Sequence, residues 1–155
     1  MSKICESLKE SFTLTYLDLS HNNLDAISCK HIGQLMKTTH NLQHLNLSYC
    51  GIRGHSARIL LNALMLNQTL KYLHLSWNSF ASSDYEFGSK LARVIQVHRG
   101  LIHLDIACTQ LKREEAMYIA QCLKDSNQIL SCHLSGNHVD YYSRIYLRAH
   151  LNAIV

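Results

Sequence analysis

Imidazole and carboxylate groups recur at regular intervals in this 155-residue chain. His74, Asp105 and His133 occupy the same place in three successive segments, and His44 and His103 stand two residues before that place in their own segments. A carboxylate between two histidines raises their pKa values, which would make binding pH-sensitive, and the same residue types bind zinc. An ordinary polar surface is the third interpretation and the one we favour, and we expect no bound metal.

Aromatic side chains with similar periodic placement form a second group of candidates. Tyr16 and Tyr72 share one place, and Tyr49 and Trp77 share another, five residues further along. If the segments form adjacent parallel strands ~4.8 Å apart, side chains at one place are lateral neighbours. We therefore expect Tyr49 to touch Trp77, with Tyr72 and His74 close by. Large rings among Ser and Asn are typical of protein-binding hot spots, although a single tryptophan can equally cover a strand-to-helix turn.

A hydrophobic signature, LxxLxLxx(N/C)xL, places these residues and occurs five times. Its copies begin at Leu14, Leu42, Leu70, Leu101 and Ile129, in steps of 28, 28, 31 and 28 residues. Apolar residues at the fourth and sixth places indicate a strand with one buried face, so the third and fifth side chains point to the opposite face. The histidine and aspartate candidates, with Tyr16 and Tyr72, stand at these two exposed places, and Tyr49 and Trp77 stand at the eighth place.

Between the signatures, the apolar residues change from alternation to helical spacing. In the second unit they are Ala57, Leu60, Leu61 and Leu64, and the same four columns recur in the others: Met1, Ile4, Cys5, Leu8; Cys29, Ile32, Gly33, Met36; Gly88, Leu91, Ala92, Ile95; and Ala116, Ile119, Ala120, Leu123. Small residues dominate two columns, which suits helices that must approach the sheet and one another closely. Each unit is therefore predicted to contain one strand and one helix.

This period and pattern resemble the leucine-rich repeat family, and the use of both Asn and Cys at the ninth place resembles its ribonuclease-inhibitor-like subclass. The resemblance implies an α/β solenoid, a horseshoe arc of about five strand-helix repeats with the parallel sheet on the concave face and the helices on the convex face. Asn22, Asn78 and Asn137 are expected to satisfy backbone groups in the turn after each strand. Cys50 and Thr109 fill the same place as smaller structural side chains.

We expect residues 1–155 to form a single leucine-rich repeat domain. Residues 1–13 would supply the leading helix of an incomplete repeat, the repeats begin near residues 14, 42, 70, 101 and 129, and residues 140–155 would form a terminal helix acting as a cap. The longer third unit would bring Tyr85 and Phe87 to one rim. A harmless variation in loop length is the favoured interpretation of this insertion, and a binding loop is the alternative.

Composition argues against several classes of partner. The chain is 47% apolar and 17% charged, and its formal charge of +4 is scattered rather than gathered into a basic stripe. We therefore expect no nucleic-acid or membrane partner, no cofactor and no small-molecule substrate. Most of the six cysteines occupy core columns, which indicates a reducing compartment. With no apparent signal peptide or membrane-spanning stretch, we expect a cytoplasmic protein, with the cytoskeleton or cilium as candidate sites.

The function that best fits these features is a non-catalytic scaffold that binds a protein partner through the concave face. Its expected contacts are Tyr16, Asp18, His44, Tyr49, Tyr72, His74, Trp77, His103, Asp105 and His133. An enzyme is not expected, because an open, wet groove lacks a strained nucleophile turn and a pocket that excludes water. One alternative is a structural subunit of a large assembly, docked through uncapped ends. Another, by analogy with the same subclass, is a regulator of a small GTPase.

Overall fold

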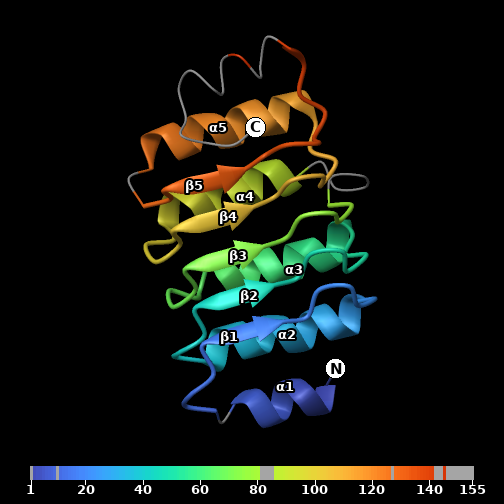
Figure 1. Cartoon of the computed structure of the whole chain (residues 1–155), viewed down its shortest axis with the longest axis vertical. Helices are drawn as coiled ribbons and strands as arrows, with labels where there is room; N and C mark the ends of the chain where they lie inside the picture. The colour runs from blue at the N-terminus through green and yellow to red at the C-terminus, as the bar shows by residue number, and fades with distance from the viewer. Residues whose placement is uncertain (1, 10, 81–85, 127, 142–144, 146–155) are drawn as a thin grey trace.

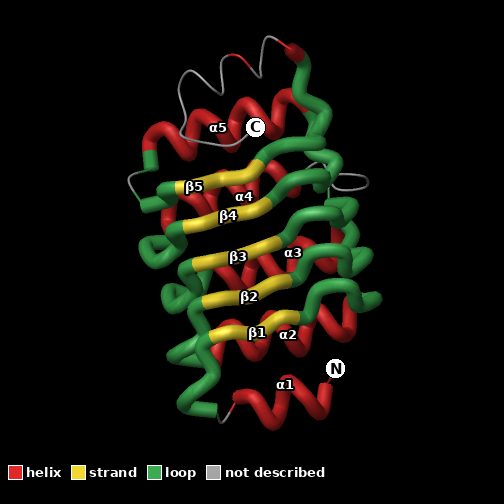
Figure 2. The backbone as a smooth tube through the Cα atoms, in the orientation of Figure 1, coloured by secondary structure: helices red, strands yellow, loops and turns green. Residues whose placement is uncertain are grey.

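Two layers make up the protein, a five-stranded parallel sheet and a row of helices on one of its faces (Figures 1 and 2). The computed structural model describes residues 2–9, 11–80, 86–126, 128–141 and 145. Within them the order is α1 (Ser2–Lys9), β1 (Tyr16–Asp18), α2 (Ala26–Thr38), β2 (His44–Asn46), α3 (Gly54–Leu64), β3 (Tyr72–His74), α4 (Phe87–Val97), β4 (His103–Asp105), α5 (Arg113–Asp125) and β5 (Ser131–His133). The strands lie side by side in sequence order. The predicted α/β solenoid is confirmed.

Corresponding repeat places pair across every strand boundary. Leu17 of β1 lies opposite Leu45 of β2, which lies opposite Leu73 of β3, and the same register continues to β4 and β5. Because no boundary is shifted, side chains that share a repeat place form straight rows across the sheet. The lateral neighbours predicted from the period are therefore correct.

Apolar side chains of strands and helices meet in one core between the two layers. Leu42, Leu45 and Leu47, the first, fourth and sixth places of the second repeat, are at most 1% exposed. The four predicted helical columns are buried throughout α2 to α5. In α1 the pattern fails at Ile4, which is 52% exposed, because α1 packs on α2 and on no other helix or strand of the described chain. No described helix has the length and apolarity needed to cross a membrane.

Small residues bring neighbouring helices together, as expected. A Cβ atom added to Gly88 of α4 would lie 2.6 Å from Cβ of Glu115 in α5, which is closer than two such carbons can approach. Instead, Glu115 accepts a hydrogen bond from the N–H of Gly88 at 3.1 Å and, through its other oxygen, one from the N–H of Lys112 at 3.0 Å. One carboxylate thus caps α5 and ties it to α4.

Ninth-place asparagines join successive turns. Asn78 donates from Nδ2 to one carbonyl oxygen of its own turn and one of the preceding turn, each at 2.8 Å. Its Oδ1 accepts from the N–H groups of Cys50 and Ile52 at 3.2 and 3.0 Å, and Asn137 makes a matching set of bonds. Burial raises the pKa of the Cys50 thiol, consistent with a structural role. This ladder holds the turns that carry the eighth-place side chains.

A second polar column, which the sequence analysis missed, closes the helix-to-strand turns. Its members stand three residues before the first place of each repeat: Ser11, Thr39, Asn67, His98 and Ser126. Oδ1 of Asn67 accepts from the N–H groups of Thr69 and Leu70, and Nδ1 of His98 accepts from those of Gly100 and Leu101. The proton of the neutral His98 ring therefore lies on Nε2, which is buried and has no hydrogen-bond partner within the described part of the chain. Burial lowers the pKa of His98 to about 4.

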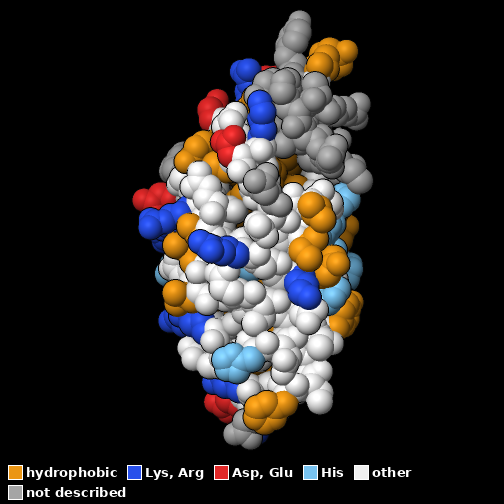
Figure 3. All heavy atoms as spheres, turned by 90° about the vertical axis from the view of Figure 1, so that its left-hand side faces the viewer, with side chains coloured by type: hydrophobic (Ala, Val, Ile, Leu, Met, Phe, Trp, Pro, Cys, Tyr) orange, Lys and Arg blue, Asp and Glu red, His pale blue; other side chains and the backbone are white. Residues whose placement is uncertain are grey.

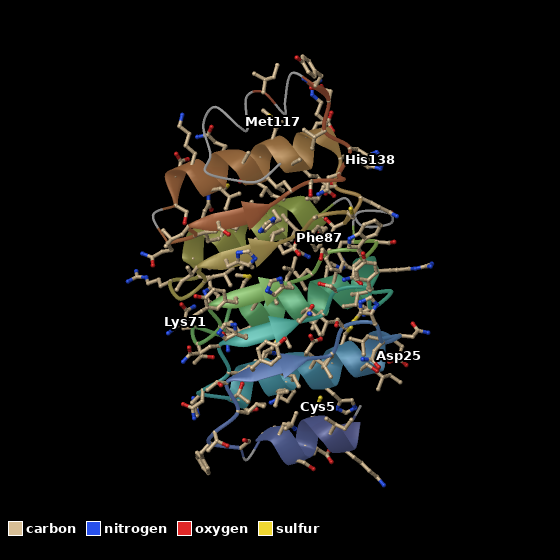
Figure 4. The ribbon with its side chains drawn as sticks, viewed as in Figure 1. Cys5, Asp25, Lys71, Phe87, Met117 and His138 are labelled. Atoms are coloured by element: carbon tan, nitrogen blue, oxygen red, sulfur yellow. The ribbon has the colours of Figure 1, made fainter. Side chains whose placement is uncertain are left out.

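The insertion in the third repeat corrects one expectation. Phe87 begins α4 (Figure 4) and is fully buried, with its ring centroid 4.8 Å from that of Phe80. The prediction that Phe87 lies at the rim is wrong, because the two rings on either side of the insertion pack together in the core. Tyr85, and most of the terminal helix expected over residues 140–155, lie outside the described residues.

Candidate functional site

The exposed face of the sheet, called the sheet face below, corresponds to the concave surface expected from the repeats. It comprises the third, fifth, seventh and eighth places of the five repeats: Tyr16, Asp18, Ser20, His21; His44, Asn46, Ser48, Tyr49; Tyr72, His74, Ser76, Trp77; His103, Asp105, Ala107, Cys108; and Ser131, His133, Ser135, Gly136. All ten predicted contact residues belong to it. In Figure 3, hydrophobic and histidine side chains alternate along the right-hand edge, which is the sheet side.

Third-place rings form an inner ladder across the strands. His44 stacks on Tyr72 with centroids 4.2 Å apart and 7° between the ring planes. Tyr16 lies 5.9 Å from His44 at one end, in a tilted arrangement. At the other end His103 lies 6.2 Å from Tyr72, and its Nδ1 forms a hydrogen bond of 2.6 Å with Oγ of Ser131. The ladder therefore extends over all five strands.

Eighth-place rings form an outer ladder beyond the carboxyl ends of the strands. His21 stacks on Tyr49 at 4.6 Å, and Tyr49 stacks on Trp77 at 5.1 Å, each with 11° between the planes. The predicted contact of Tyr49 with Trp77 is confirmed. His21 also stands at the eighth place and was expected on this face, but it was not selected from the sequence as a contact residue. Ring contacts among the described residues do not join this outer ladder to Tyr72 or His74.

The outer ladder stands on a left-handed backbone. The φ angle is 57° at His21, 56° at Tyr49 and 57° at Trp77, and the last two places, Cys108 and Gly136, have 53° and 71°. A residue other than glycine pays roughly 1 kcal/mol in this region. Glycine in the fifth repeat meets the same geometry without that cost. Because this backbone geometry favours glycine, it does not explain why three repeats carry a ring at the eighth place. Two of these rings are well exposed, Tyr49 at 44% and Trp77 at 54%.

Fifth-place polar side chains cap the turns that follow them. Asp18, Asn46 and Asp105 each accept at Oδ1 from the N–H two residues further on, at 2.8, 3.0 and 3.0 Å. Oδ2 of Asp18 also accepts from Nδ2 of Asn46 at 3.0 Å and from the hydroxyl of Tyr16 at 3.3 Å. These bonds, with those from Ser20 the strongest, hold the pKa of Asp18 below its usual value.

His103 is the centre of a histidine cluster that spans β3 to β5. Its ring centroid lies 5.0 Å from those of both His74 and His133. Burial first, and then the positive charge of its two neighbours, lower the pKa of His103 against the opposing effect of Asp105. The sequence correctly placed His74, Asp105 and His133 in one row. It did not place the ring of His103 between the two other imidazoles.

Asp105 is ionised within this cluster. Burial raises the pKa of Asp105, but the nearby His74 imidazole, the hydrogen bond from the N–H of Ala107 and the neighbouring Ser76 hydroxyl together lower it below the usual value. Nδ1 of His74 lies 3.8 Å from Oδ2 of Asp105. Across the described ranges, no group of three or more His, Cys, Asp or Glu side chains is arranged to hold a metal ion. The geometry therefore gives the zinc interpretation no support.

Comparison with known proteins relates the sequence to repeat proteins. One leucine-rich repeat model matches residues 10–31 and 66–83, and a second matches residues 41–63. The NACHT, LRR and PYD domains-containing protein 13 of Homo sapiens is 28% identical over 138 residues, covering 88% of this chain and 13% of that protein. Leucine-rich repeat-containing protein 45 of Gallus gallus is 26% identical over 126 residues, covering 81% and 19%. The chain thus spans less than a fifth of the length of these curated relatives.

Solved structures of low sequence identity share the fold. The actin-binding site 2 domain of leiomodin-1 superposes with a TM-score of 0.78 at 15% identity, covering 95% of this chain and 84% of that one. The C-terminal domain of Caenorhabditis elegans tropomodulin gives 0.75 at 14% identity, covering 97% and 90%. The two family-model matches, the five-fold signature and the sheet-and-helix stack together show that the chain is built of leucine-rich repeats.

Proposed function

We propose that this chain is a non-catalytic module that binds a protein partner through the sheet face, with residues 1–155 acting as one repeat domain. The observation that carries the proposal is the exposed stack of His21, Tyr49 and Trp77 on left-handed backbone positions. Strained positions persist where the surrounding structure and a function require them. Rings that are already stacked lose little rotamer entropy on binding, which is the property of a pre-formed hot spot.

The inner ladder extends the same surface toward the amino ends of the strands. His44 and Tyr72 stack at 4.2 Å, and the seventh-place hydroxyls of Ser48 and Ser76 hydrogen-bond at 3.1 Å between the two ladders. Rings bordered by small polar side chains give a partner both apolar contact area and hydrogen-bonding groups. The proposed contact surface therefore comprises the ten predicted residues and His21.

The proposal includes a reducing, cytoplasmic setting and excludes a catalytic role. All six cysteines are free thiols. Burial raises the pKa of five of them, namely Cys5, Cys29, Cys50, Cys122 and Cys132. Thiols of this kind behave as small core residues. The expected partner is a protein, not a nucleic acid, a membrane or a small molecule.

A second candidate is a structural element of a larger protein or assembly, including a cytoskeletal one. One structural neighbour is named for an actin-binding site, which supports this candidate. Contacts would then fall on exposed parts of the helix layer, such as Ile4 on α1. Substituting Ile4 by Lys would disturb such a contact without altering the sheet face.

The test compares three baits in affinity purification followed by mass spectrometry. The ring variant is Tyr49→Ala with Trp77→Ala, and the matched control is Ile27→Ala with Tyr118→Ala, which removes exposed hydrophobic side chains from α2 and α5. We expect proteins to be lost from the ring variant and retained by the wild type and the control. A purified protein found in this way should also change the fluorescence of Trp77. Equal retention by all three baits would contradict the proposal, and loss of proteins from the helix-layer control alone would favour the second candidate.

A further inference from the structure

The sheet face differs in charge from the molecule as a whole. Its twenty places hold no lysine or arginine and only two carboxylates, Asp18 and Asp105. With neutral histidines its charge is −2, whereas the whole chain carries +4. Lys71 is not one of these places: it lies beside the amino end of β3, whereas the outer ladder lies beyond the carboxyl ends of the strands (Figure 4). A partner surface complementary in charge to the sheet face is therefore cationic.

The two carboxylates are separated by a distance that an extended peptide spans in a few residues. Asp18 lies on β1 and Asp105 on β4, so three strand spacings, ~14 Å, separate their rows. An extended segment laid across the strands covers that distance in about four residues. The hydrogen bonds that cap the turns hold both groups in the ionised form and in fixed positions. Two cations about four residues apart can therefore reach both carboxylates.

Trp77 offers a flat, exposed surface beyond the carboxyl end of β3. The outer ladder covers one face of its ring with Tyr49, at 5.1 Å. On the other side the eighth places hold Cys108, which is small, and Gly136, which has no side chain, and no further ring contact of Trp77 occurs there among the described residues. Asp105 lies on β4, the strand that pairs with β3. The sheet face thus offers planar cations both a ring to stack on and a carboxylate to pair with.

We propose that the sheet face binds a partner segment that carries arginine and lies across the strands, with guanidinium groups that pair with Asp105 and Asp18 and stack on exposed rings such as Trp77. This inference rests on the proposed function of the sheet face and names the chemistry of its partner. Arginine fits better than lysine, because a guanidinium group stacks on rings and pairs with a carboxylate through two donors.

Five histidines give the sheet face a second charge state. They are His21, His44, His74, His103 and His133, and their full protonation changes the charge of the face from −2 to +3. The cluster around His103 is faced by Asn46 on β2, Tyr72 on β3, Asp105 on β4 and Ser131 on β5. One carboxylate thus opposes three imidazoles. Acidification should therefore release a cationic segment by charge repulsion.

The test uses Trp77 as a reporter, because it is the only tryptophan in the chain. The complete chain is titrated at low ionic strength and neutral pH with three peptides of equal length that repeat the units Arg-Ser-Ser-Ser, Lys-Ser-Ser-Ser and Glu-Ser-Ser-Ser. The arginine peptide should change the fluorescence and bind about tenfold more tightly than the glutamate peptide. The lysine peptide should fall between them.

Matched variants test the two carboxylates. Asp18→Asn with Asp105→Asn removes both charges but keeps the turn caps, because Asn46 makes the same cap at this place. Affinity for the arginine peptide should fall about tenfold. The control, Glu6→Gln with Glu114→Gln, removes the same charge from exposed places on α1 and α5 and should change affinity by less than about twofold.

A triple variant tests the acid response. His74→Asn, His103→Tyr and His133→Asn introduce residues that the chain already uses at these places in other repeats, as at Asn46 and Tyr16. Between about pH 7.5 and pH 5.5 the wild type should lose about tenfold in affinity, and the triple variant should lose much less. Equal acid sensitivity of the two proteins would overturn the assignment of the response to this cluster.

Two further outcomes separate this inference from the proposed function. Binding of the glutamate peptide as tight as that of the arginine peptide, or full affinity in the double aspartate variant, overturns the inference. Suppose that either of these results is obtained but the Tyr49→Ala, Trp77→Ala variant still loses its partner proteins in the affinity purification. The proposed function then stands, and only the proposed chemistry of the partner is wrong. If the ring variant retains every partner as well, the proposed function fails with it.

Discussion

Oδ1 of Asn78 accepts a hydrogen bond from the N–H of Cys50 at 3.2 Å, across one full repeat. With three companion bonds it closes two successive turns, and all of the bonded groups are buried. Since the eighth-place residue stands directly before the asparagine, this bond helps to hold Tyr49 and Trp77 in the stacked arrangement. The structural ladder and the candidate binding surface are therefore coupled.

Replacing Asn78 by Ala should lower the free energy of unfolding by about 4 kcal/mol, because two N–H groups and two carbonyl groups lose their partner in a buried turn. The control is Asn22→Ala, where the side chain is exposed and donates to two carbonyl groups, with an expected loss of about 1 kcal/mol. Urea unfolding followed by circular dichroism measures both. Equal losses would contradict the buried ladder.

Stability should fall on acidification because of His98. Its pKa is about 4 in the folded protein and 6.5 when unperturbed. As pH falls below 6.5, the unfolded state binds a proton first, so stability decreases until about pH 4 and then this contribution is constant. The expected total is about 3 kcal/mol, from a difference of roughly two and a half pKa units. Unfolding curves collected across this range measure the loss.

The variant His98→Asn isolates that contribution. Asn67 shows that asparagine satisfies the same turn, and its Nδ2 also donates to the carbonyl of Met36 at 2.7 Å. We expect this variant to be at least as stable as the wild type near neutral pH and to lose less stability on acidification. An unchanged pH profile would show that other groups cause the acid sensitivity.

Trp77→Gly should separate binding from stability. Loss of the ring removes a stacking contact worth about 1 kcal/mol, and glycine relieves a left-handed strain of roughly the same size. The melting temperature should therefore change little, while partner binding is lost. Tyr72→Gly is the control, because its strand backbone is not strained and glycine costs about 1 kcal/mol more there. A larger loss of stability in Trp77→Gly than in Tyr72→Gly would argue that the ring is structural.

Phe87→Ala should be among the most destabilising single changes. Phe87 is fully buried against Phe80 beside the insertion, and truncation of such a ring costs about 3–5 kcal/mol. Phe12→Ala removes the same ring from a position that is 84% exposed and should cost less than about 0.5 kcal/mol. Thermal denaturation of the pair tests the correction to the predicted position of Phe87.

One thiol should react faster than the other five. Cys108 is partly exposed on the sheet face, whereas the remaining cysteines are buried. With a chromogenic disulfide reagent we expect one rapid equivalent, and Cys108→Ser should remove it. Persistence of the rapid phase in this variant would show that a buried thiol becomes accessible through local opening.

Periodicity alone was enough for much of the architecture. Because a repeat must bury the same places each time, the signature predicted the parallel register, the buried columns of α2 to α5 and the paired contact of Tyr49 with Trp77. It failed at Ile4 and Phe87, where burial depends on which neighbour is present. A repeat pattern records what every unit shares and carries no information about a single unit's surroundings.

The order of residues thus decided which side chains share a row and which face of the sheet they occupy. The folded chain decided how those side chains meet: the left-handed backbone under His21, Tyr49 and Trp77, the position of His103 between two imidazoles, and the buried ring of His98. The row that a side chain occupies follows from its place in the repeat, because the repeat has a regular period along the chain. Ring orientation, backbone angle and desolvation depend on atoms from neighbouring repeats, which come together only when the strands are stacked.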